Sequence, residues 1–135
     1  MQVVIYNLFF IFFCFLLFVS CNEKQENQNQ QSEIVLLSKK ISNEPNNIKL
    51  LLDRVDYNLS KNNYESAIYD LKQCVILDSL NADIRYKLGN SYFNLSKTSQ
   101  KIEHINSSIL HWEKAVQIDK KNYLSVSLLG DIFLA

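Results

Sequence analysis

Two histidines come nearest to a catalytic or metal-binding pattern in this sequence. His104 and His111 are seven positions apart, with Glu103 and Glu113 beside them. On a helix, seven residues are about two turns, so the two imidazoles would share a face but lie roughly 10 Å apart, too far to share one zinc ion. The sequence contains no glycine-rich phosphate loop, serine elbow or Cys-x-x-Cys pair. We therefore expect a protein that is not an enzyme and has no metal or other cofactor.

A cysteine stands at the border between an apolar and a polar segment of the chain. Residues 3–19 read VVIYNLFFIFFCFLLFV, with one polar residue and no charge, and all 14 Lys and Arg and all 14 Asp and Glu come after Cys21. The apolar run is at the short end of the roughly 17–25 residues that cross a bilayer. Because it begins near the first methionine and is followed by the small residue Ser20, it is built like a secretory signal.

The residues around this cysteine resemble the lipobox of bacterial lipoprotein signal peptides. The residues that fit are Leu16, Leu17, Val19, Ser20 and Cys21. The resemblance implies that residues 1–20 are removed and that diacylglycerol and acyl chains are attached to Cys21. Two or more chains anchor a protein stably to a membrane, here one of the bacterial envelope, on its periplasmic or surface side. An uncleaved transmembrane helix or an ordinary cleaved signal is the alternative.

Composition indicates a flexible segment after Cys21 and argues against a nucleic-acid partner and an internal disulfide. Residues 22–33, NEKQENQNQQSE, contain no apolar side chain, so residues 21–33 are predicted to be a flexible tether. The net charge is 0 and no basic cluster occurs, which argues against nucleic acid as a partner. Of the 3 cysteines, only Cys74 follows the tether, so no internal disulfide is expected.

From residue 34 onward the pattern predicts helices. Ile34, Leu37 and Ile41 form an apolar face, and residues 43–45 end this first segment. Farther on, residues 75–95, VILDSLNADIRYKLGNSYFNL, are repeated by residues 116–135, VQIDKKNYLSVSLLGDIFLA, with an offset of 41. The matched pairs are Asp78 and Asp119, Leu88 and Leu129, Gly89 and Gly130, and Tyr92 and Phe133.

The repeat resembles the tetratricopeptide family, whose period is about 34 residues. Pro45 and Ser79 are 34 positions apart, and Ala67 stands at the small position of the family's second helix. The resemblance implies an all-α domain at residues 34–135, a short right-handed solenoid of antiparallel helix pairs. The predicted units are 48–81, 82–122 with an insertion, and an incomplete 123–135. The seven extra residues of the second unit are expected around residues 96–107, where they lengthen the turn or the second helix.

Packing explains why small residues recur in this register. Helices whose axes lie about 8–10 Å apart need small side chains where they cross. The residues expected at these crossings are Ala67, Cys74, Gly89, Ala115 and Gly130. Larger residues are expected to fill the space between the crossings, namely Leu71, Leu88, Tyr92 and Trp112.

The resemblance also implies a function. Members of the family bind an extended peptide or a helix of a partner protein in a concave groove lined by the first helix of each unit. Carried over, the groove positions are Lys49, Leu52, Asp56, Asp83, Tyr86, Asn90, Phe93, Leu124 and Asp131. Some members clamp a terminal carboxylate with several basic residues; here only Asn90 fits that pattern, and Tyr86 stands where a lysine is needed.

The sequence thus predicts a lipid-anchored adaptor that holds a partner protein at an envelope membrane. The alternative is a small transmembrane or lipid-tethered accessory subunit of an envelope enzyme complex, or a protein that binds a small ligand through its histidine-containing insertion.

The third unit stops after its first helix, with an apolar face uncovered. This pattern leaves three possibilities: a fragment of a longer array, a helix that pairs with a partner, or a homodimer through that helix.

Overall fold

The computed structural model describes residues 32–133 of the chain. The apolar segment 3–19, Cys21 and most of the predicted tether lie outside the described residues. The chain divides into two units, Met1–Leu37 and Ser38–Ala135, and the second contains the five helices from Ile48 onward. None of the described helices is both long and apolar enough to span a bilayer.

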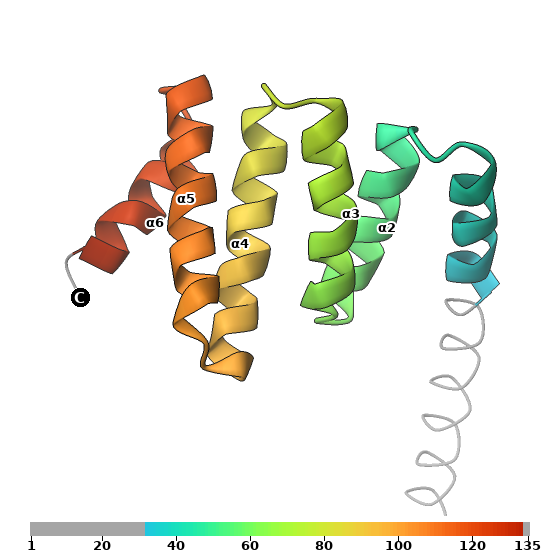
Figure 1. Ribbon diagram of the computed structural model, residues 1–135, viewed down its shortest axis with the longest axis horizontal. Helices are drawn as coiled ribbons and strands as arrows, with labels where there is room; N and C mark the ends of the chain where they lie inside the picture. Colours follow the sequence, from blue (N-terminus) through green and yellow to red (C-terminus); the bar gives the residue numbers. More distant parts are fainter. Residues whose placement is uncertain (1–31, 134–135) are drawn as a thin grey trace, which may run out of the picture. The chain divides into compact units, whose positions relative to one another are not determined.

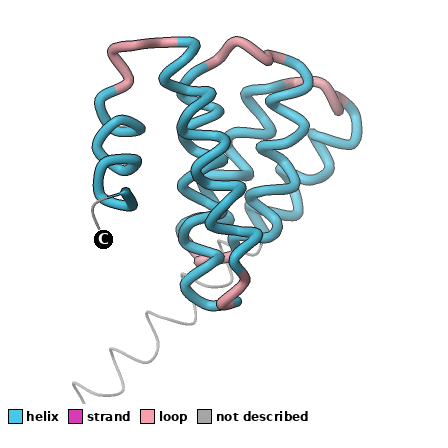
Figure 2. The backbone as a smooth tube through the Cα atoms, turned by 60° about the vertical axis from the view of Figure 1, so that its left-hand side comes forward, coloured by secondary structure: helices cyan, strands magenta, loops and turns pink. Residues whose placement is uncertain are grey.

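The second unit is a succession of antiparallel helices. Residues 32–43 are helical, and five further helices follow. They are α2 (Ile48–Ser60), α3 (Tyr64–Leu77), α4 (Ala82–Ser99), α5 (Ile102–Ile118) and α6 (Tyr123–Phe133). From α2 to α6, each helix packs mainly on its neighbours in sequence, and a short connection reverses the chain after each one (Figures 1 and 2).

Asparagine starts most of these helices. The side chains of Asn47, Asn63 and Asn81 each accept a hydrogen bond from the backbone N–H three residues later, and Asn122 does the same at the start of α6. Each bond satisfies one of the N–H groups that a helix leaves free at its first turn. Helix α5 differs, because it starts after Lys101 with no side-chain cap.

The second helix pair is longer than the first. Helices α4 and α5 contain 18 and 17 residues, against 13 and 14 in α2 and α3. The turn between α4 and α5 is only Gln100 and Lys101, shorter than that of the first pair. The sequence predicted the seven extra residues of the second unit in its turn or its second helix. This is corrected by the structure, in which the first helix of the unit, α4, is lengthened more than the second, α5. Residues 94–99 contain no Gly or Pro, so α4 continues until Gln100 adopts a left-handed φ of 55°.

The hydrophobic core runs between successive helices. Ala67, Cys74 and Ala115 are fully buried where small side chains were predicted. Close approach of the helix backbones at these positions leaves room for larger side chains beside them. The larger apolar residues with almost no exposed surface are Leu51, Val55, Leu71, Ile84, Leu88 and Trp112.

The two glycines occupy different environments. A Cβ placed on Gly89 would lie 2.6 Å from Cδ1 of Trp112 and 3.0 Å from the backbone oxygen of Ser108, so α4 and α5 approach closely here. A Cβ placed on Gly130 would meet nothing within 4 Å. The crossing predicted at Gly130 is therefore not observed, because nothing in the described chain packs against that side of α6.

Candidate functional site

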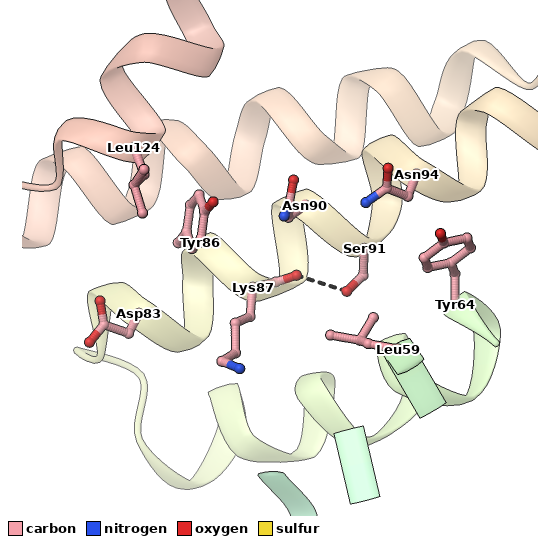
Figure 3. A pocket seen from close by; sticks show the side chains of 9 residues that line it. All are labelled: Leu59, Tyr64, Asp83, Tyr86, Lys87, Asn90, Ser91, Asn94 and Leu124. Carbon is pink, nitrogen blue, oxygen red and sulfur yellow. Dashed lines mark hydrogen bonds between the residues drawn. The ribbon is translucent and has the colours of Figure 1, made fainter. Parts of the chain in front are cut away.

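A groove of about 520 Å³ runs along α4 (Figure 3). Most of its lining comes from one face of this helix, because positions that recur every three or four residues point the same way. Leu124 of α6 lies near the Tyr86 end, and Leu59 of α2 and Tyr64 of α3 lie near the other end. The residues contributed by α4 are Asp83, Tyr86, Lys87, Asn90, Ser91 and Asn94.

Several polar groups of the groove already have partners inside the molecule. The Lys87 ammonium bonds to the carboxylate of Asp56 at 2.7 Å, in an exposed ion pair. The Ser91 hydroxyl donates to the backbone oxygen of Lys87 at 2.8 Å. The Asn94 side-chain oxygen accepts a hydrogen bond from Lys97 at 3.2 Å. These bonds hold the side chains in place and neutralise the lysine of the groove.

Three other lining residues are available to a ligand. Within residues 32–133, the side chains of Asp83, Tyr86 and Asn90 make no hydrogen bond or ion pair. Tyr86 and Asn90 are half-buried, whereas Asp83 is exposed. A carboxylate, a phenol and an amide along one helix face supply a charge, an apolar surface and both donors and acceptors.

The sequence anticipated part of this lining. Asp83, Tyr86, Asn90 and Leu124 were expected in the groove, and the structure brings these four together. Phe93 was also expected there, but it packs against the indole of Trp112, with ring centroids 5.5 Å apart. Phe93 therefore contacts α5 and does not line the groove.

The remaining predicted groove residues lie elsewhere along the unit. Lys49 is exposed and Leu52 is half-buried on α2, and neither lines the groove. Asp56 is exposed and contributes indirectly, through its ion pair with Lys87. Asp131 is exposed on α6, outside the lining.

Sequence reasoning missed five lining residues. Lys87 and Asn94 could have been predicted, because they follow the expected groove residues Asp83 and Asn90 by four positions on α4. Ser91, Leu59 and Tyr64 gave no such signal, because their place depends on how the first helix pair packs beside α4.

The two histidines lie on α5 and share an aromatic neighbour. The ring of Tyr92 stacks on His111 with centroids 5.9 Å apart, and it lies 6.0 Å from the ring of His104. His104 Nδ1 also makes a 2.7 Å hydrogen bond with the hydroxyl of Ser99. The ammonium of Lys72, an exposed residue of α3, lies 5.8 Å from the Tyr92 ring centroid.

This environment keeps His111 neutral. Burial, followed by the nearby charges of Arg85 and Lys72, lowers the pKa of His111 from 6.5 to about 4. Its buried Nδ1 has no hydrogen-bond partner in the described residues. Within the same residues, no three His, Cys, Asp or Glu side chains are grouped so that they could hold a metal ion. Through their contacts with Tyr92, the two histidines contribute to packing between α4 and α5.

The cysteine of the domain is also enclosed by the core. Cys74 is fully buried, and burial, with a contribution from Asp70, raises the pKa of its thiol to about 11. Nucleophilic chemistry requires the thiolate form and access to a substrate. Cys74 has neither, so its role is that of a small core residue at a helix crossing.

Comparison with known proteins identifies the helical repeat. The family model of the TPR repeat matches residues 58–96, from the end of α2 through most of α4, and no catalytic family was found. A comparison with the curated proteins found no match.

Two solved structures share the fold. The crystal structure of MamA has a TM-score of 0.66 and 22% identity over 82% of this chain, which spans 61% of the MamA chain. The first TPR of Spaghetti (RPAP3), bound to the HSP90 peptide SRMEEVD, has a TM-score of 0.65 and 17% identity, and 84% of each chain is covered. At such identities the likeness shows the fold alone. The TPR description rests on the family model that matches residues 58–96. Residues 58–96 therefore match a TPR repeat, and the chain has an all-α helical repeat fold similar to that of TPR domains.

Proposed function

We propose that this protein is a non-enzymatic adaptor that binds a segment of a partner protein in the groove along α4. Tetratricopeptide repeats indicate protein–protein interaction in general. The observation that carries the specific proposal is the row formed by Asp83, Tyr86 and Asn90, which have no partner within the described chain and line one groove.

The chemistry of these side chains suits a peptide. An extended segment brings backbone N–H and C=O groups that must be paired when they leave water. The Asn90 amide offers both a donor and an acceptor, and Tyr86 offers a hydroxyl beside a broad apolar ring. Leu59 and Leu124 supply apolar surface at the two ends of the groove.

The size of the groove fits a short segment. From Asp83 to Asn94 the helix axis covers about 16 Å at 1.5 Å per residue. An extended chain rises about 3.3 Å per residue, so this length corresponds to about five residues of a partner. The RPAP3 domain with the similar fold was solved with a peptide bound, which supports a peptide as the ligand class here.

The groove proposal predicts a specific loss of binding. We expect the variant Tyr86→Ala with Asn90→Ala to bind the partner at least tenfold more weakly, because it loses the central anchors of the groove. The measurement is affinity purification of the tagged full-length chain from its native host, with the retained proteins quantified by mass spectrometry. Unchanged thermal unfolding would show that the variant is folded.

A matched pair on α3 provides the control. Tyr69 and Gln73 are exposed, have the same four-residue spacing and do not line the groove. The variant Tyr69→Ala with Gln73→Ala is expected to retain every partner of the unaltered chain. If both double variants retained the same partners, the groove would not be the binding site.

We further propose that the adaptor is anchored to an envelope membrane through lipid on Cys21. What supports this is the sequence around the cysteine and the polar segment 22–33 after it. The expected result is a chain recovered from host membranes that begins at Cys21 and is heavier by a diacylglycerol, with or without a third acyl chain. Intact mass spectrometry is the measurement, and an unmodified chain that retains residues 1–20 would contradict the anchor.

A further inference from the structure

The charges along the groove are not balanced at its Asp83 end. Lys87, one turn away, is held by Asp56 at 2.7 Å, so its charge is already neutralised. Asp83 is exposed and has no ion pair within residues 32–133. Toward the opposite end, Lys97 bonds to Asn94 and lies 4.5 Å from the ring centroid of Phe93. An uncompensated negative charge is thus present at one end of the groove and not at the other.

The neighbour of Asp83 also suits a cation. Tyr86 follows it by three positions on the same face of α4, and the two side chains lie at the same end of the groove (Figure 3). A lysine or arginine is attracted both to a carboxylate and to the face of a tyrosine ring. A carboxylate placed there would meet Asp83 as a like charge, and Lys87 would have to leave Asp56 to compensate it.

We propose that the groove recognises a neutral or basic segment of a partner protein that places a Lys or Arg side chain between Asp83 and Tyr86. This inference rests on the proposed function, since it names the class of peptide that the same groove takes. It differs from capture of an acidic C-terminal tail, which requires free basic residues in the groove.

The test is a selection of peptides by the full-length chain in detergent. A phage library of random decapeptides is selected on this chain, and clones that also bind the Tyr86→Ala, Asn90→Ala variant are discarded. Each remaining peptide is then synthesised with its basic residues and with glutamine in their place. Affinities are measured for the unaltered chain, for Asp83→Asn, and for Asp53→Asn, which alters an exposed carboxylate of α2 outside the groove lining.

We expect the groove-dependent peptides to be rich in Lys and Arg. Replacing the basic residue by glutamine should weaken binding roughly three- to fivefold for the unaltered chain and for Asp53→Asn, the range expected for an exposed ion pair. The same replacement should have a clearly smaller effect on Asp83→Asn, where only the Tyr86 ring remains to attract the cation. High salt should reduce the difference, because exposed charges are screened.

Two other outcomes distinguish a failure of the basic-peptide proposal from a failure of the proposed groove function. Peptides that need Tyr86 and Asn90 but lack basic residues, or that bind Asp83→Asn with the same basic preference, overturn the inference and leave the groove function standing. A selection that yields no peptide dependent on Tyr86 and Asn90 overturns both.

Discussion

Replacing Gly89 by alanine is expected to destabilise the folded chain by about 2–3 kcal/mol, because the interior of a packed helix pair resists overfilling. The added Cβ would lie 2.6 Å from Cδ1 and 2.7 Å from Nε1 of Trp112, and 3.0 Å from the backbone oxygen of Ser108. Trp112 is fully buried and packs against Phe93, so its indole has little room to move. Urea unfolding followed by circular dichroism measures the change in the free energy of unfolding.

The second glycine provides the control. Alanine is a better helix former than glycine by about 0.5–1 kcal/mol, and a Cβ at Gly130 would meet no atom within 4 Å. Gly130→Ala should therefore stabilise the chain by roughly that amount, so the same substitution has opposite signs at the two positions. Equal effects at Gly89 and Gly130 would show that α4 and α5 do not approach as closely as the structure has them.

Small and apolar residues made much of the fold predictable. Ala67, Cys74 and Ala115 stand at the small positions of the repeat register, and all three are fully buried. The turns were also readable, because asparagine caps the helix that follows, as Asn81 caps α4. These features depend on neighbours close in sequence, which is why one sequence reveals them.

Features that depend on packing between helices were harder to predict. Residues 94–99 carry no Gly or Pro, so the sequence permits α4 to continue through them, but it has no signal that fixes the end of the helix at Ser99. Phe93 lies close to Asn90 in sequence, but the position of Trp112 on α5 decides which way it packs. Leu59 joins the groove only through the way the first helix pair sits beside α4.

The ion pair between Arg54 and Asp70 was not predicted from the sequence. A single aspartate in an amphipathic helix has the appearance of a solvated residue, and its partner is 16 positions away on α2. In the structure Asp70 is 1% exposed, and its two carboxylate oxygens accept hydrogen bonds from Nε and Nη2 of Arg54, each at 2.7 Å. The hydrogen bond to Asp70 is also the main reason why the pKa of Arg54 is raised.

Arg54→Met is therefore expected to destabilise the chain by about 3–5 kcal/mol, because the Asp70 carboxylate would remain buried without its counter-charge. Arg54→Lys should cost less than Arg54→Met, since it keeps the charge but loses the two-pronged geometry. The measurement is again the free energy of unfolding in urea, at neutral pH and low salt.

Two comparisons show whether burial is the cause. The double variant Arg54→Met with Asp70→Leu removes both charges, so it should be considerably more stable than the sum of the single changes implies. Lys87→Met breaks the exposed pair with Asp56, whose side chains are 38% and 61% exposed, and should cost at most about 1 kcal/mol. If Arg54→Met lowered the free energy of unfolding no more than Lys87→Met does, water would have to reach the Asp70 carboxylate. The close packing of α2 on α3 around Asp70 would then be contradicted. A large cost for Arg54→Met that the double variant largely recovers would instead show that this ion pair is needed mainly because Asp70 is buried.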